Sequence, residues 1–121
     1  VPALEAFKPD LIAVACGFDA NAFDPLSHMI CHSETYREMT RQVKAVADQV
    51  CGGRLVICQE GGYAPAYIPY CAMPVFETLS GRRSGVEDPM LDFAGNMGGH
   101  ELLPHQEAAI AAAREVARRI G

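Results

Sequence analysis

Two short runs of consecutive apolar residues occur along the chain, at residues 11–16 and 55–58. Both are short, and neither alternates apolar with polar positions, which is typical of strands buried on both faces of a parallel sheet. Between them, apolar residues recur every three or four positions over residues 33–50, as on one face of a helix, and the glycine pair at 52–53 ends that helix. The order strand, helix, strand predicts a right-handed crossover between two parallel strands.

The segments after the second run are less regular. Residues 66–79 are apolar and predict a helix that Pro69 and Pro74 interrupt. Residues 85–99 are rich in glycine, acid and methionine without a period, so we expect a loop there. Residues 104–120 predict an alanine-rich helix with arginines near its end, where they suit the helix dipole.

These elements predict the α/β fold class, with a parallel sheet flanked by helices. Both strands then finish at the same edge of the sheet, which brings the loop at 17–26 close to the loop at 59–64, where open α/β sheets bind ligands. Two parallel strands cannot bury one another, and an isolated two-stranded sheet is marginal. We therefore expect an incomplete fold, whose further strands come from an upstream portion or from a second copy of the chain.

The composition suits one globular domain. The chain has 121 residues, of which 50% are hydrophobic and 21% are charged. Its net charge of −5 gives no electrostatic reason to bind nucleic acid or an anionic membrane, and a small or cationic substrate is easier to accommodate. The sequence has neither an apolar run long enough to span a bilayer nor the pattern of a signal peptide, so we expect a cytoplasmic protein.

The five cysteines and the first residue bear on compartment and processing. The cysteines are odd in number, form no CxxC pair, and several lie in apolar segments, so we expect reduced buried thiols and not a disulfide framework. The chain begins at Val1 and not at a methionine, which we take to indicate a cut or processed product.

Two acids, Asp19 and Asp24, lie in the loop that follows the first predicted strand. A carboxylate held there by rigid backbone can be aimed at a metal or a substrate. Aspartate in such a loop also caps turns. On local chemistry alone we favour the turn-capping role for Asp19, and for Asp24 both roles stay open.

The loop after the second predicted strand contains Glu60, Gly61, Gly62 and Tyr63 in succession. Paired glycines permit positive φ and a close backbone approach, and a tyrosine phenol is protonated at neutral pH, so it can donate to a developing oxyanion. Taken alone, the motif is more often a glycine turn followed by a packed tyrosine.

Together these segments resemble the histone deacetylase and acetylpolyamine amidohydrolase superfamily, especially its class II and bacterial branch. The matching stretches are residues 8–12, 17–20, 24–26, 52–54 and 60–63. The resemblance covers roughly residues 2–80 in order and in strand context. It implies that residues 1–121 are the C-terminal part of a single deacetylase catalytic domain with the arginase/deacetylase-type fold.

The resemblance also implies roles for individual residues. Asp24 matches the family's aspartate ligand to Zn²⁺, and Tyr63 matches the catalytic tyrosine that stabilises the tetrahedral oxyanion. Gly61 and Gly62 match the backbone beside the substrate, and Asp19 matches a structural loop residue. In the implied reaction, zinc-bound water attacks the amide of an acetylated amine, either acetyl-lysine or acetylpolyamine, and a histidine acts as general base.

The sequence departs from the family pattern in two motifs. The family's Asp-x-His pair of zinc ligands and its tandem histidine lie N-terminal to the matched region, and this sequence contains neither motif. A catalytic zinc takes three protein ligands, so we expect the chain alone neither to bind zinc tightly nor to hydrolyse amides. We assign no chemistry to His100 and His105.

A rival metal site uses Asp24, His28 and His32, which are spaced by four residues. They would line one face of a helix if Pro25 began one. Paired histidines at a surface are more often simply solvated.

The leading hypothesis is therefore the C-terminal part of a zinc-dependent amidohydrolase that removes acetyl groups. The alternative is a noncatalytic truncated remnant that acts through self-association, as a homo-oligomer, or through partner binding. An upstream Asp-x-His and histidine pair would favour the enzyme, and a continuous upstream coding sequence without them would favour the remnant.

Overall fold

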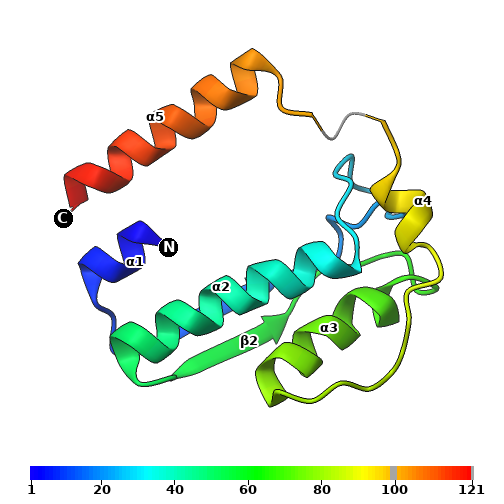
Figure 1. Ribbon diagram of the computed structural model, residues 1–121, viewed down its shortest axis with the longest axis horizontal. Coiled ribbons are helices and arrows are strands. Elements are labelled where there is room, and N and C mark those ends of the chain that lie inside the picture. Colours follow the sequence, from blue (N-terminus) through cyan, green and yellow to red (C-terminus); the bar gives the residue numbers. More distant parts are fainter. Residues whose placement is uncertain (99–100, 121) are drawn as a thin grey trace.

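The computed structural model describes residues 1–98 and 101–120. Its elements are α1 (Pro2–Phe7), β1 (Ile12–Cys16), α2 (Ser33–Cys51), β2 (Leu55–Gln59), α3 (Ile68–Ser80), α4 (Leu91–Gly95) and α5 (Pro104–Ile120). The two strands pair in parallel, with Ile12 beside Leu55 and Cys16 beside Gln59, and α2 is the crossover between them (Figure 1). The predicted strand, helix, strand order is therefore confirmed.

Helix α2 covers one face of the sheet with its apolar stripe. Val46, Ala47 and Cys51 are buried together with Ile12 of β1. Gly52 ends the helix with a left-handed backbone of φ +61°, as the glycine pair predicted. This stripe therefore packs α2 against the start of β1.

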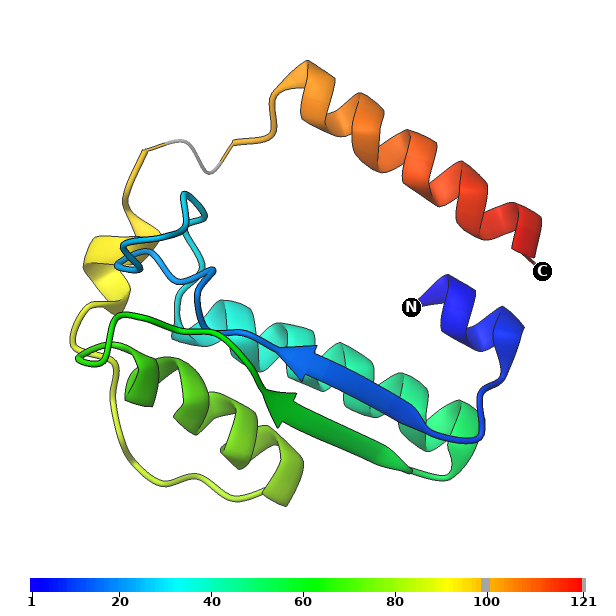
Figure 2. The same ribbon diagram turned by 180° about the vertical axis from the view of Figure 1, so that it is seen from behind.

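The opposite face of the sheet is open in the described structure. Alternate residues of both strands are exposed on it, among them Ala13, Ala15 and Val56, and Val56 is 48% exposed. In Figure 2 the strands lie in front of α2, and no other element crosses in front of them. The packed helices lie on one side only, so this chain leaves uncovered the second face that the apolar runs predict to be buried, as the expectation of an incomplete fold implies.

Helix α3 packs beside α2 through a second apolar cluster. Tyr67, Cys71 and Val75 are buried there against Tyr36 of α2. The helix runs through both prolines that were expected to interrupt it. Pro69 lies in the first turn, where a helix needs no N–H donor, and the rest of α3 is held by its packing against α2.

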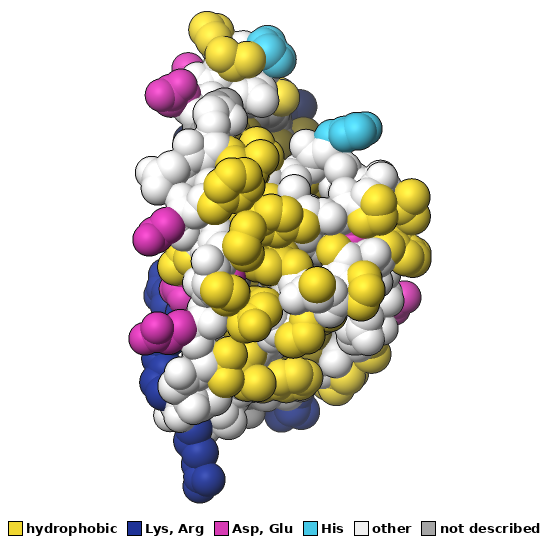
Figure 3. Space-filling view, turned by 90° about the vertical axis from the view of Figure 1, so that its right-hand side faces the viewer, with side chains coloured by type: hydrophobic (Ala, Val, Ile, Leu, Met, Phe, Trp, Pro, Cys, Tyr) yellow, Lys and Arg dark blue, Asp and Glu magenta, His cyan; other side chains and the backbone are white. Residues whose placement is uncertain are grey.

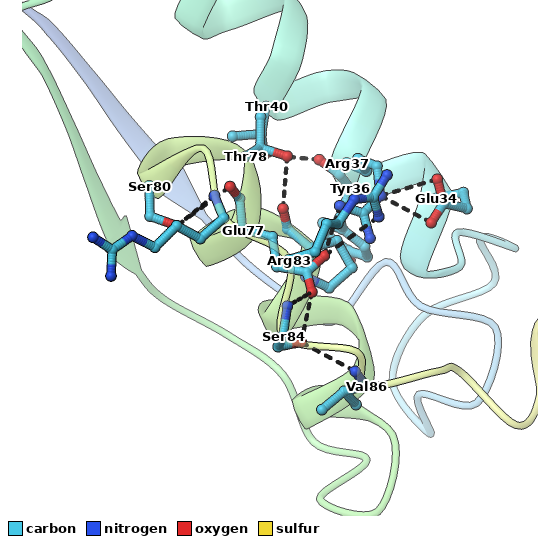
Figure 4. Close-up of polar contacts among 12 residues, drawn as sticks. Glu34, Tyr36, Arg37, Thr40, Glu77, Thr78, Ser80, Arg83, Ser84 and Val86 are labelled. Atoms are coloured by element: carbon cyan, nitrogen blue, oxygen red, sulfur yellow. Dashed lines mark hydrogen bonds and ion pairs between the residues drawn. The ribbon is translucent and has the colours of Figure 1, made fainter.

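A buried carboxylate ties the chain after α3 back to both helices (Figure 4). Glu77 is 6% exposed and accepts hydrogen bonds from the N–H of Ser84 at 2.6 Å and from the Ser84 hydroxyl. Its Oε2 also lies 2.8 Å from Nη1 of Arg37 on α2. The hydrogen bonds from Ser84 and Arg37 lower the pKa of the Glu77 carboxyl to about 2.

Two short helices, α1 and α4, were not predicted. Helix α4 lies in the segment expected to be a loop, and Asp88 organises its start. The Asp88 carboxylate accepts hydrogen bonds from the Met90 N–H at 2.9 Å and from the Tyr67 hydroxyl at 2.7 Å. Five residues are too few for an apolar period to reveal the helix.

The long C-terminal helix α5 is confirmed, with its bounds at Pro104–Ile120. It lies apart from the sheet and approaches α1 (Figure 1). Within residues 1–98 and 101–120, none of the helices has the length and apolar character needed to cross a membrane.

Candidate functional site

The loops that follow β1 and β2 meet at the carboxyl edge of the sheet, as predicted. The N–H of Phe18 donates to the carbonyl of Gly61 at 2.8 Å, and the N–H of Glu60 donates to the carbonyl of Cys16 at 3.1 Å. These two hydrogen bonds continue the pairing of the strands into the loops. The parallel register therefore decides which residues of the two loops lie together.

Asp24 lies where the two loops join. Its carboxylate is buried, with the residue 7% exposed, and both oxygens accept a backbone hydrogen bond. The N–H of Leu26 donates to Oδ1 at 2.9 Å, and the N–H of Tyr63 donates to Oδ2 at 2.7 Å. A carboxylate can accept about four hydrogen bonds, so each oxygen of Asp24 keeps a further lone pair for a metal or a substrate.

Asp19 lies between the two loops. Its carboxylate occupies the space that a Cβ would need at Gly17 and also at Gly61. A side chain at either glycine would therefore displace Asp19. Gly62 has φ +138°, and a Cβ on it would meet Phe18, so this position favours glycine for its backbone as well as for its space.

Tyr63 presents its side chain to the surface. It is 53% exposed, whereas its backbone N–H is held by Asp24. A tyrosine fixed at its backbone and open at its ring can place a phenol against a ligand without rearranging the loop.

Aromatic residues surround the backbone next to Asp24. The ring of Phe23 lies edge-on to Tyr67, with 4.7 Å between centroids, and 5.9 Å from the ring of Phe93 on α4. Beside them is an open groove of about 560 Å³. Figure 3 looks onto this end of the molecule and shows apolar side chains gathered across it. In the first loop, Leu26 is 71% exposed.

The rival metal site is not formed. The segment between Asp24 and Ser33 is not helical, so the spacing of four does not bring His28 and His32 onto one face with Asp24. His32 instead precedes α2, where its N–H donates to Oγ1 of Thr35 at 3.3 Å. Over the part of the chain that the structure describes, no group of three or more histidine, cysteine, aspartate or glutamate side chains is placed to hold a metal ion.

The remaining histidines and the cysteines lie as follows. His100 lies outside the described residues, and His105 is exposed in the first turn of α5. All five cysteines carry free thiols. Burial raises the pKa of the Cys16 and Cys31 thiols and raises that of Cys71 to about 12, so these thiols stay protonated at neutral pH.

Comparison with known proteins identifies the family. The sequence model of the histone deacetylase domain family matches residues 1–79 of this chain. This chain belongs to the histone deacetylase family. It is 56% identical over 93 residues to a histone deacetylase-like amidohydrolase from Pseudomonas aeruginosa and 35% identical over 81 residues to a probable deacetylase from Archaeoglobus fulgidus.

Solved histone deacetylase domains share the fold. The histone deacetylase Clr3 superposes with a TM-score of 0.72 at 26% identity, covering 99% of this chain and 18% of Clr3. The HDA15 domain superposes with a TM-score of 0.58 at 32% identity, covering 67% of this chain and 22% of HDA15. The predicted arginase/deacetylase fold, incomplete in this chain, is therefore confirmed.

The matched region is only a part of each relative. It covers 77% of this chain but 24% of the Pseudomonas protein, and 66% of this chain but 23% of the Archaeoglobus protein. Histone deacetylases are generally zinc dependent, and a catalytic zinc takes three protein ligands. Since Asp24 is a single carboxylate and the described residues form no three-ligand group, they do not make a zinc site by themselves.

Sequence reasoning missed Asn21, which is fully buried three residues before Asp24. The available signal was weak. Asparagine is common in loops, and a single sequence does not distinguish a solvated asparagine from one buried with both amide ends bonded.

Proposed function

We propose that this chain is the C-terminal part of the catalytic domain of a zinc-dependent amidohydrolase that removes acetyl groups from acetyl-lysine or acetylpolyamine. The observation that supports it is the hydrogen bond of 2.7 Å between the Tyr63 N–H and the Asp24 carboxylate. It joins the two loop residues that this chemistry requires, 39 positions apart in sequence, at the edge of the sheet where α/β proteins bind ligands.

Each residue has a separate task in this proposal. Asp24 supplies one carboxylate ligand, held in direction by the N–H groups of Leu26 and Tyr63. The exposed phenol of Tyr63 donates a hydrogen bond to the oxyanion that forms as the amide carbonyl is attacked. Gly61 and Gly62 let the backbone approach the substrate closely. Zinc, when bound in a complete domain, supplies Lewis acid chemistry.

The proposed substrate is an acetylated amine, and the charge of the chain suits it. The chain carries a net charge of −5, which attracts a cationic amine or a lysine-rich peptide from solution. Hydrolysis converts the neutral acetyl amide into acetate and a free amine. We propose that polyamine and lysine substrates share this chemistry at the amide and differ only in what surrounds it.

The test replaces Tyr63 by phenylalanine in a complete domain that contains this sequence. Loss of one oxyanion donor should lower kcat on an acetyl-lysine peptide or an acetylpolyamine by roughly 100- to 1,000-fold, with little change in bound zinc. Tyr70→Phe, the same substitution on α3, serves as the matched control. Unchanged turnover in the Tyr63→Phe domain, or a wild-type domain that neither binds zinc nor releases acetate, would overturn the proposal.

A second candidate is a noncatalytic remnant that acts by self-association. It draws support from the open face of the sheet, where Val56 is exposed, and from the groove of about 460 Å³ between β1 and α2. Val14, Met39 and Val43 are among the residues that line this groove. A second copy of the chain could cover these apolar surfaces, and the oligomeric state in solution tests this.

A further inference from the structure

The side chain of Asn21 bridges the two ends of the turn that carries Asp24. Asn21 is 0% exposed. Its Nδ2 donates to the carbonyl of Phe18 at 2.6 Å, and its Oδ1 accepts from the N–H of Phe23 at 2.8 Å. Both ends of the amide are therefore used, one on each side of the turn.

The backbone of Asn21 adds further restraints. Its carbonyl accepts from the N–H of Asp24 at 3.1 Å. The residues on either side of Asn21 pair with Cys31. The Cys31 N–H donates to the carbonyl of Ala20 at 3.0 Å, and the Ala22 N–H donates to the carbonyl of Cys31 at 2.9 Å. The turn is thus fixed to the segment that leads into α2.

The same turn is tied to the second loop of the site. The carbonyl of Phe18 accepts a hydrogen bond from the Asn21 side chain, and the N–H of Phe18 donates to the carbonyl of Gly61 at 2.8 Å. The N–H of Asp24 donates to the carbonyl of Asn21, and the Asp24 carboxylate accepts a hydrogen bond from the N–H of Tyr63. Asn21 therefore lies between the two points at which the loops are joined.

The two partners of the amide require an asparagine. A carbonyl oxygen needs a donor and an N–H group needs an acceptor, so the amide can lie in one orientation only. Asn21→Asp has nearly the same shape but brings a carboxylate oxygen against the Phe18 carbonyl, where the two oxygens repel. Asn21→Leu would leave both backbone groups buried without a partner.

We propose that Asn21 is a positioning residue that holds the Asp24 carboxylate in the direction needed by a metal and keeps it bonded to Tyr63. This inference rests on the proposed function, since it takes Asp24 as a ligand. It goes further by assigning the affinity of the site partly to a residue that touches neither metal nor substrate. A purely structural role would lower the thermal stability of the domain and leave the metal affinity of the folded protein unchanged.

The experiment compares Asn21→Asp with the wild type in a complete, zinc-loaded domain that contains this sequence. The dissociation constant of zinc is measured by competition with a chromophoric chelator, well below the unfolding temperature, and kcat and KM are measured on an acetyl-lysine peptide. Removal of such a supporting residue should weaken zinc binding by about 10- to 100-fold, with kcat falling and KM staying within about 2-fold.

The matched control is Asn96→Asp. Asn96 is the other asparagine of the chain, and its side chain also donates to a backbone carbonyl, that of Asp92 at 2.6 Å, but on the exposed end of α4. The same chemical change there should leave zinc affinity and kcat at their wild-type values. Equal loss in both variants would overturn the proposal.

The outcomes separate this inference from the proposed function. A wild-type domain without zinc or activity refutes the proposed function itself. A wild-type domain with both, beside a folded Asn21→Asp domain of unchanged zinc affinity, refutes only the role of Asn21. If Asn21→Asp does not fold, hydrogen exchange in the wild-type domain tests the proposal instead. The backbone amides of Phe23 and Asp24 should then be protected as well as that of Ile12 in β1. Exchange of these two amides as fast as that of the exposed Met29 would overturn the proposal.

Discussion

Replacement of Asp24 by asparagine tests whether the two loops of the site are coupled, without reference to zinc. The Asp24 carboxylate accepts two backbone N–H groups, one from Leu26 and one from Tyr63. Asparagine has almost the same shape but only one acceptor oxygen. One of the two N–H groups must therefore face an NH₂ group and lose its partner.

We expect Tyr63 to be the residue that loses its partner. Leu26 lies two residues after Asp24 in the same turn and moves with it, whereas Tyr63 is held from the other loop. A buried donor without an acceptor costs about 1–3 kcal/mol. If local opening exposes the Tyr63 amide, that cost corresponds to exchange roughly 5- to 150-fold faster than in the wild type.

Hydrogen exchange with residue-level mass spectrometry on a zinc-free complete domain that contains this sequence measures this effect. We expect faster exchange at Tyr63 and unchanged exchange at Leu26. Asp48→Asn is the control, because Asp48 is an exposed aspartate paired with Lys44 at 2.8 Å towards the far end of α2. Exchange at Tyr63 that matches the wild type in Asp24→Asn would refute the claim that Asp24 restrains the second loop.

Three further predictions concern stability and association. The ion pair and hydrogen bonds of Glu77 lower its pKa to about 2 in the folded chain, so they stabilise the fold above the unfolded pKa and this contribution is lost as pH falls. The difference in unfolding free energy between wild type and Glu77→Gln, measured by denaturant titration, should therefore shrink between about pH 4.5 and pH 2. A difference that stays constant over this range would contradict the prediction. Gly61→Ala should displace Asp19 and lower the melting temperature more than Gly95→Ala, where a Cβ meets no atom. The isolated chain should form oligomers or aggregates in light scattering and show no deacetylation, and a monodisperse monomer with stoichiometric zinc would refute this.

The sheet and the meeting of the loops could be predicted because they depend on strong periodic signals. Two apolar runs separated by an amphipathic helix determine a parallel crossover, and a parallel crossover places both strand ends at one edge. The proximity of Asp24 and Tyr63 follows from that topology. The short helices α1 and α4 carry no comparable signal, because each is too short for an apolar period, and the start of α4 depends on the side-chain hydrogen bonds of Asp88.

Predictions failed where tertiary contacts outweighed local preference. Pro74 lies inside α3 because packing against α2 holds the helix on both sides of it. The spacing of Asp24, His28 and His32 suggested one helix face, yet the segment between them is irregular. Asn21 and Cys31 hold it in an extended pairing, and a single sequence shows no period for such a contact.

The open surfaces of the chain indicate where a further strand could pack. Helix α3 packs against the cluster to which Ile57 of β2 belongs, whereas the groove between β1 and α2 is open and is lined mostly by residues of these two elements, together with Val1. A further parallel strand beside β1 would bury Val14 and Met39, which line that groove. Such a strand would also end at the edge that carries Asp24, because parallel strands share their carboxyl ends. Under the proposed function, the chain that supplies that strand is therefore placed to bring further zinc ligands next to the Asp24 carboxylate.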